Sequence, residues 1–131
     1  MIFSIKYLRR VVLVRILICG SRTWTDWKTI VKFIKTLPPG SIIIEGHCRG
    51  ADMMAGTIAT EYGFDVEVYA AEWYRFGKAA GPIRNQQMLD EGKPDLVVAF
   101  HNNLSRSRGT RDMINRAKKA LIPVQVIESD N

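Results

Sequence analysis

The sequence predicts a single α/β domain in which a mostly parallel sheet of about five strands forms the middle of three layers. Runs of β-branched and apolar residues alternate along the chain with runs whose apolar residues recur at helical spacing. Near-continuous apolar strands are typical of parallel sheets that are covered on both faces. The length of 131 residues corresponds to about one domain, and the 47% hydrophobic content is enough for a core without a disulfide or a metal.

Turn-forming or polar residues separate the expected elements. The expected strands are residues 11–19, 41–45, 64–70, 95–100 and 122–127. The expected helices are residues 27–37, 52–62, 83–91 and 109–120. The first helix has Thr25 or Asp26 as its N-cap, and Trp27, Ile30 and Ile34 recur along it at helical spacing. Residues 1–13 fit no strong pattern, so we expect an N-terminal extension followed by a domain of residues 14–131.

Charge and cysteine content narrow the class of protein. The formal net charge is +6, which suits either a solvated basic surface or a site for an anionic ligand such as a nucleotide or nucleic acid. No apolar run approaches the roughly 20 residues that span a bilayer, so we expect no membrane partner. Cys19 and Cys48 share no metal-binding or redox spacing, which favours a reducing compartment and a cytoplasmic location.

The distinctive polar residues follow the ends of the expected strands. Because the carboxyl ends of parallel strands meet at one edge of a sheet, we expect these residues to converge there on a ligand. Glycine allows close backbone approach, and the start of a helix favours a phosphate. Two expected helix starts carry such residues. The candidates in these loops are Gly20, Ser21, Arg22, Gly46, Gly50, Ala51, Asp52, Ser107, Gly109 and Thr110.

Single residues in these loops carry competing interpretations. Asp52 either caps its own helix or accepts a hydrogen bond from a ribose hydroxyl. Glu45, His47 and Cys48 are neighbours whose side chains point apart, so we expect no metal site. His101 has no partner visible in the sequence and is interpreted as a surface loop residue.

A long segment, residues 72–85, carries three aromatic residues together with glycine, proline and charge. A connection of this length in a compact domain is usually functional or disordered, and its aromatic content argues against disorder. We therefore expect a structured binding loop. Its candidate ligand contacts are Trp73, Lys78, Gly81, Pro82, Arg84 and Asn85.

These motifs together resemble a known family. The chain has Gly-Ser-Arg after the first strand, Gly-x-x-x-Gly-Ala-Asp after the second, Gly-Lys-Ala-Ala-Gly-Pro-x-Arg-Asn in the long segment, and Ser-x-Gly-Thr before the last helix. This set resembles the YspA family of the SLOG superfamily, which also includes the LOG phosphoribohydrolases and DprA. The resemblance runs from about Ile16 to Val126. It implies a Rossmann-like fold that binds a nucleotide or nucleotide-derived ligand, with no further cofactor, and pairing into a homodimer.

Comparison with the LOG enzymes bears on catalysis. The resemblance implies that their catalytic arginine corresponds to Arg84, but their catalytic glutamate corresponds to Met113. Cleavage of an N-glycosidic bond needs a carboxylate, which methionine cannot replace. Asp112 is one residue away, about 100° around the helix, and is expected to face elsewhere. The remaining carboxylates that could act with Arg84 are Asp52 and Glu72.

The sequence thus favours a domain that binds a nucleotide or an ADP-ribose-like molecule as a sensor or sequestering protein. Two alternatives stay open. One is a nucleotide N-glycosidase that uses Arg84 with Glu72 or Asp52. The other is a DprA-like module that binds single-stranded DNA through its basic residues.

Overall fold

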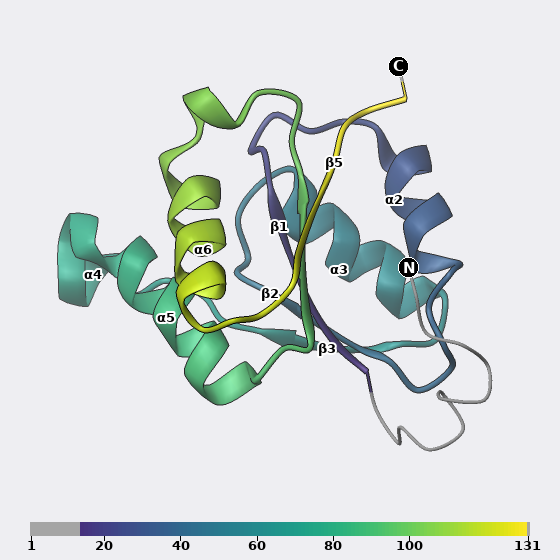
Figure 1. The fold of residues 1–131 in the computed structure, drawn as a ribbon, viewed down its shortest axis with the longest axis horizontal. Helices are drawn as coiled ribbons and strands as arrows, with labels where there is room; N and C mark the ends of the chain where they lie inside the picture. Colours follow the sequence, from purple (N-terminus) through teal and green to yellow (C-terminus); the bar gives the residue numbers. More distant parts are fainter. Residues whose placement is uncertain (1–13, 131) are drawn as a thin grey trace.

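Five parallel strands form one sheet in the order β3-β2-β1-β4-β5 in the computed structural model, which describes residues 14–130 (Figure 1). Every neighbouring pair is parallel. The strands are β1 (Arg15–Gly20), β2 (Ile42–Glu45), β3 (Asp65–Val68), β4 (Leu96–Phe100) and β5 (Val124–Ile127). The predicted parallel sheet of five strands is therefore confirmed.

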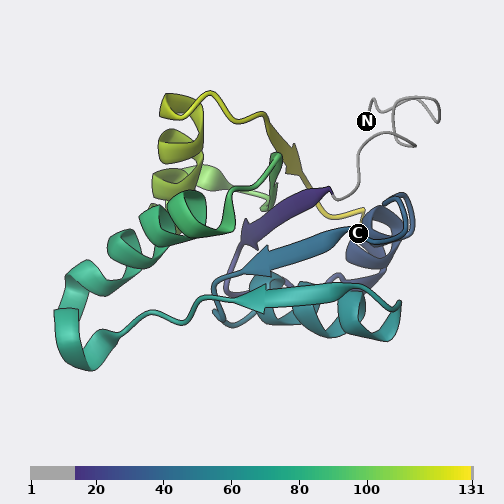
Figure 2. The same cartoon turned by 90° about the horizontal axis from the view of Figure 1, so that it is seen from below.

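Helices cover both faces of this sheet (Figures 1 and 2). The helices α2 (Trp27–Ile34) and α3 (Ala51–Glu61) pack on one face, and α5 (Ala80–Gly92) and α6 (Arg108–Lys119) pack on the other. Alternate residues of β1 point to opposite faces: Ile16 and Ile18 join the first core cluster, whereas Leu17 and Cys19 join the second. Both faces of the central strand are buried, which explains its unbroken apolar sequence.

Several predicted boundaries differ from the observed ones. The first strand begins at Arg15, and residues 11–13 of the predicted strand, like the predicted extension 1–13, lie outside the described residues. The third and fifth strands are shorter than predicted. Trp27 begins α2 but is 54% exposed, although it shares its spacing with Ile30 and Ile34. The buried face of α2 consists of Thr29, Ile30, Phe33 and Ile34.

The segment 72–85 is helical over most of its length, so the predicted loop was wrong. It contains the short helix α4 (Trp73–Phe76), a 3-10 turn η1 (Gly77–Ala79) and the first turns of α5. Pro82 lies in the first turn of α5, where a missing amide costs no helical hydrogen bond. The Trp73 ring packs over Gly81. Figure 2 shows that α4 and η1 project from the body of the domain as an arm.

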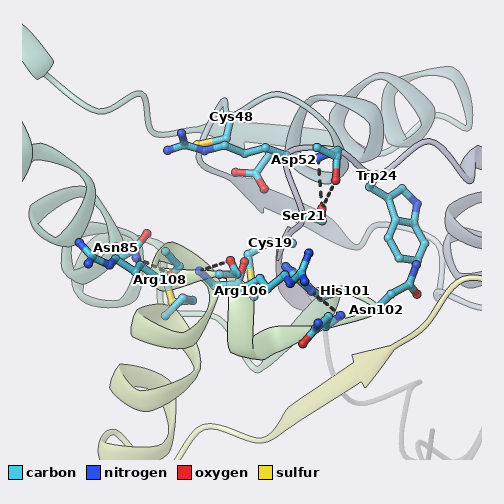
Figure 3. A pocket seen from close by; sticks show the side chains of 18 of the residues that line it. Cys19, Ser21, Trp24, Cys48, Asp52, Asn85, His101, Asn102, Arg106 and Arg108 are labelled. Atoms are coloured by element: carbon cyan, nitrogen blue, oxygen red, sulfur yellow. Dashed lines mark hydrogen bonds between the residues drawn. The ribbon is translucent and has the colours of Figure 1, made fainter.

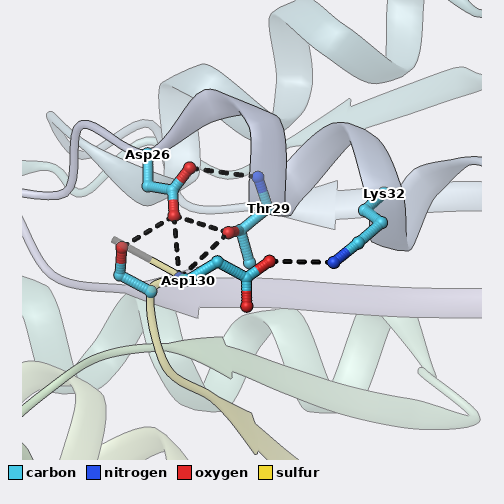
Figure 4. Close-up of polar contacts among 5 residues, drawn as sticks. Asp26, Thr29, Lys32 and Asp130 are labelled. Atoms are coloured by element: carbon cyan, nitrogen blue, oxygen red, sulfur yellow. Dashed lines mark hydrogen bonds and ion pairs between the residues drawn. The ribbon is translucent and has the colours of Figure 1, made fainter.

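The C-terminal residues attach to the start of α2 (Figure 4). Asp26, one of the two predicted candidates, is the N-cap of α2 and accepts a hydrogen bond from the Thr29 amide at 3.2 Å. Its carboxylate also accepts hydrogen bonds from the Ser129 hydroxyl (2.7 Å), the Asp130 amide (3.1 Å) and the Thr29 hydroxyl (2.5 Å). Lys32 pairs with Asp130 at 2.9 Å on the exposed side. The hydrogen bonds from Ser129 and Thr29 lower the pKa of Asp26 to about 2.

We expect Asp26→Asn to destabilise the protein near neutral pH, and we expect this difference to disappear in acid. Because the folded pKa of Asp26 is lowered, its charge stabilises the folded state above the unfolded pKa, about 4, and this contribution is lost as the pH falls towards 2. Thermal melts from pH 7 to pH 2 measure the difference. Asp130→Asn is the control, because the exposed Lys32–Asp130 pair contributes little. A difference independent of pH would contradict this assignment.

Candidate functional site

A cavity lies at the point where the order of the strands reverses across the sheet. Strands β1 and β4 are neighbours, but the chain continues from β1 to β2 on one side and from β4 to β5 on the other. Ligands of open α/β sheets bind at such a switch point, beyond the carboxyl ends of the strands. The cavity has a volume of about 810 Å³, within the range of small-molecule sites. In Figure 3, Asp52 and Cys48 lie across it from Arg106 and His101.

The turn after β1 forms one wall of the cavity. Ser21 donates its amide to the Phe100 carbonyl (3.0 Å) and accepts at its own carbonyl from the Ala51 amide (3.0 Å). A side chain at Gly20 would collide with the Phe100 carbonyl, so this position requires glycine. Arg22 is exposed and has no ion-pair partner within residues 14–130. The turn thus presents a free guanidinium on a rigid backbone.

The start of α3 lies next to this turn, and the amides of Ala51 and Met53 there are already bonded to protein carbonyls. The Ala51 amide bonds to Ser21, and the Met53 amide donates to the Cys48 carbonyl at 3.1 Å. Gly50 precedes the helix at φ +77°, a conformation that favours glycine. Asp52 accepts from the Gly46 amide at 3.2 Å, so its carboxylate bonds back to the preceding loop instead of capping its own helix.

Two buried carboxylates and one buried guanidinium lie close together at the start of α3. Glu45, Asp52 and Arg84 are 4%, 5% and 8% exposed. Burial and, next, the carboxylate of Glu45 raise the pKa of Asp52 to about 7, although the positive charge of Arg84 opposes them. Burial also raises the pKa of Glu45. Asp52 lines the cavity and therefore presents a carboxyl group that can exchange a proton near neutral pH.

Arg84 is held by hydrogen bonds from three directions. It donates to the Gly46 carbonyl, to Asn85 Oδ1 at 3.1 Å and to Cys48 Sγ at 3.6 Å. A side chain at Gly46 would occupy the position of the guanidinium, so glycine is needed there for this contact. Arg84 lines the cavity but is already bonded to protein groups. It can add positive charge to the site without being a free binding group.

Asn85 connects Arg84 to α6. Its amide Nδ2 donates to Asp112 Oδ2 at 2.9 Å and to the Gly109 carbonyl at 3.3 Å. Asp112 also pairs with Arg116 at 2.8 Å. Asp112 faces α5 and away from the cavity lining, as expected from its position on the helix, and Met113, which is 1% exposed, lines the cavity. The position that the motif resemblance matches to the LOG glutamate is therefore occupied by a buried methionine.

The start of α6 is the second helix start that lines the cavity. Ser107 is the N-cap, and its hydroxyl accepts from the Thr110 amide at 3.3 Å. The amides of Arg108 and Gly109 are in the first turn, where no intrahelical partner exists. Arg106 and Arg108 are exposed and line the same cavity. This corner combines a helix N-terminus with two guanidinium groups, an arrangement suited to a phosphate.

His101 was wrongly interpreted as a surface loop residue. It is 8% exposed, it lines the cavity, and burial lowers its pKa. Its Nδ1 accepts from the Asn103 amide at 2.9 Å, which leaves the proton of the neutral ring on Nε2. A position directly after β4, at the edge where the other candidate loops converge, was the signal that could have identified it.

The predicted site residues divide into three groups. The cavity is lined by Gly20, Ser21, Arg22, Asp52, Arg84, Asn85, Ser107, Gly109 and Thr110. Loop geometry and helix contacts behind the lining depend on Gly46, Gly50 and Ala51. The residues of the arm and its junction with α5 do not line the cavity, and these are Glu72, Trp73, Lys78, Gly81 and Pro82. The lining residues that the sequence did not identify as candidates include Cys19, Trp24, Met88, His101 and Asn102.

Within residues 14–130, no group of three or more His, Cys, Asp or Glu side chains is placed to hold a metal ion. No helix of the same residues is long and apolar enough to cross a membrane.

Fold and cavity together define a Rossmann-like α/β domain with a cavity at the switch point of its sheet. A comparison with solved structures supports the fold: DNA processing protein A (DprA) from Streptococcus pneumoniae superposes with a TM-score of 0.58 at 15% identity. That match covers 89% of this chain and 59% of DprA, so the chain spans less than two thirds of DprA.

The sequence comparisons give the family. The model of the YspA, cpYpsA-related SLOG family matches residues 14–76. The Gene 61 protein of Mycobacterium phage D29 is 40% identical over 119 residues, which are 84% of this chain and 93% of that protein. The chain belongs to the YspA, cpYpsA-related SLOG family, as the motifs predict.

We expect the free energy of unfolding of Asp52→Asn, relative to that of the unchanged protein, to increase as the pH rises from 5 to 8. The folded pKa of Asp52 is raised to about 7 from an unfolded value near 4, so the folded state binds the extra proton between these values. The unchanged protein therefore loses stability as the pH rises through this window, and the variant does not. Asparagine can still accept from the Gly46 amide.

Urea unfolding at pH 5, 6, 7 and 8 measures this difference. The control is Asp112→Asn, which changes a carboxylate outside the cavity lining. If the two variants show the same pH profile, the raised pKa is not a property of Asp52.

Proposed function

We propose that this protein binds a nucleotide or nucleotide-derived small molecule in the switch-point cavity, as a sensor or sequestering domain. The observation that carries the proposal is the corner at the start of α6, where first-turn amides, Arg106 and Arg108 border one cavity. Membership of the SLOG family fits nucleotide-related or DNA binding in general. The ligand within that class is our inference.

Of the two predicted phosphate positions, the start of α6 is the better one. The amides of Ala51 and Met53 at the start of α3 are bonded to protein carbonyls, and the buried carboxylate of Asp52 stands beside them. A carboxylate with little access to water repels a second anion strongly. At α6, in contrast, the charged groups bordering the cavity are arginines.

The rest of the cavity suits the uncharged part of a nucleotide. Asp52 and Asn85 offer polar groups to ribose hydroxyls, and His101 offers a ring N–H. Met88 and Met113, each 1% exposed, form an apolar backing to the cavity lining. Pairing of two copies, which the resemblance implies, stays a prediction.

We expect Arg106→Ala and Arg108→Ala each to weaken binding of AMP by about tenfold or more, because a hydrogen bond to a charged group contributes roughly 1.5–3 kcal/mol. Isothermal titration calorimetry with AMP and with adenosine measures the effect, and the loss should be confined to AMP. Lys118→Ala is the matched control, since it removes one positive charge near the other end of α6. Equal affinity for adenosine and AMP would exclude a phosphate position at α6.

A nucleotide N-glycosidase is the second candidate, favoured by one observation. Asp52 lines the cavity with a pKa near 7 and lies beside Arg84, which suits a general acid or base. Glu72 is on the arm and outside the cavity lining, so Asp52 is the carboxylate that this candidate requires.

If the protein is a glycosidase, free base should be released from nucleoside monophosphates, Asp52→Asn should lower the rate at least about a hundredfold, and Glu72→Gln should have no effect. Chromatography of incubated nucleotides measures the released base. Recovery of intact nucleotide from a protein shown to bind it would leave the binding function and exclude the glycosidase.

A further inference from the structure

A second cavity lies beside the first, between α2 and α3. Its volume is about 560 Å³. We refer to it as the Trp27 groove, and its lining residues are Arg22, Thr23, Trp24, Thr25, Trp27, Gly50, Met53, Met54, Thr57, Ile58 and Glu61. Four of these, the consecutive residues 22–25, also line the switch-point cavity. The two cavities are therefore separated only by the turn after β1.

The groove exposes apolar groups that the fold does not use. Trp27 is 54% exposed and Met53 is 43% exposed, although both are on helices whose other faces are packed on the sheet. Lys28 lies over the Trp27 ring, 5.7 Å from its centroid. An exposed indole next to flexible thioethers makes a surface on which a flat ring can stack.

The ridge between the cavities carries a free positive charge. Arg22 lines both cavities, is exposed, and has no ion pair within residues 14–130. The ridge itself is rigid, because Ser21 is bonded to both Phe100 and Ala51, and Gly50 packs directly on the Ser21 carbonyl. An unpaired guanidinium on a fixed backbone suits a bridging phosphate chain.

We propose that the Trp27 groove is a second ring-binding site, and that the ligand is a dinucleoside polyphosphate whose phosphate chain crosses the ridge at Arg22. One nucleoside occupies the switch-point cavity, and the second stacks its base on Trp27 and Met53. This inference rests on the proposed nucleotide binding and specifies its ligand class. The continuity of the two cavities across residues 22–25 is what selects this occupant over an unrelated partner.

The test compares ADP with diadenosine polyphosphates that contain two, three or four phosphates, by calorimetry on the full chain. For at least one chain length we expect binding about tenfold or more tighter than that of ADP, since stacking of a base on an aromatic side chain has an effect of this size. Trp27→Ala should return that affinity to the level of ADP and leave ADP binding unchanged. Arg22→Ala should also weaken the diadenosine compound more than ADP.

The control is Trp73→Ala, because Trp73 is 49% exposed but lines neither cavity. Met53→Ala is a second groove variant that tests the same site if Trp27→Ala melts early. The inference is overturned if ADP binds and no diadenosine compound binds more tightly, or if Trp27→Ala weakens ADP equally. Trp27-dependent binding of a single-stranded oligonucleotide, without tighter diadenosine binding, overturns it as well. Failure of AMP and ADP alike to bind overturns the proposed function on which it rests.

Discussion

The candidate site depends on the hydrogen bonds of the buried Arg84 guanidinium. This group extends from α5 to the Gly46 carbonyl and the Cys48 sulfur, and so joins the helical layer on one face of the sheet to the loop that leads into α3 on the other. A buried charge is tolerated only where it is paired and hydrogen-bonded. The nearby carboxylates of Asp52 and Glu45 supply the opposite charge, and the Gly46 backbone supplies the acceptor. Separating the two layers would leave the Arg84 charge buried without these partners, which is unfavourable. The contact therefore holds the two layers in a fixed relative position.

The same contacts distinguish Arg84, which is bonded to protein groups, from the exposed arginines that line the cavity. Arg84 is occupied by protein groups, and through Asn85 it is connected to Gly109 and Asp112 of α6. Its charge lowers the pKa values of Asp52 and Glu45, whose burial would otherwise favour their neutral forms still more strongly. The arginines that remain exposed along the cavity, Arg22, Arg106 and Arg108, are those without a structural task of this kind. An anionic ligand has these three groups to approach.

Sequence periodicity and loop position predicted a large part of the site. Strands that end in glycine or polar residues must deliver those residues to one sheet edge, so Gly20, Asp52 and Thr110 could be assigned to a common site before any coordinates. His101 was missed because its burial comes from packing between neighbours that are distant in the sequence. The segment 72–85 was misassigned because its glycines and Pro82 are also compatible with the start of a helix.

The sequence by itself determined the α/β class, the parallel sheet and the sheet edge at which the cavity lies, because the hydrophobic period and the alternation of strands and helices follow from local pattern. Tertiary structure alone decided which polar groups are free. Arg84 and Arg22 are the same residue type at the same edge, but one is buried in a network and the other is exposed between two cavities. That difference arises from contacts between residues distant in the sequence, such as Arg84 with Gly46, which no local pattern encodes.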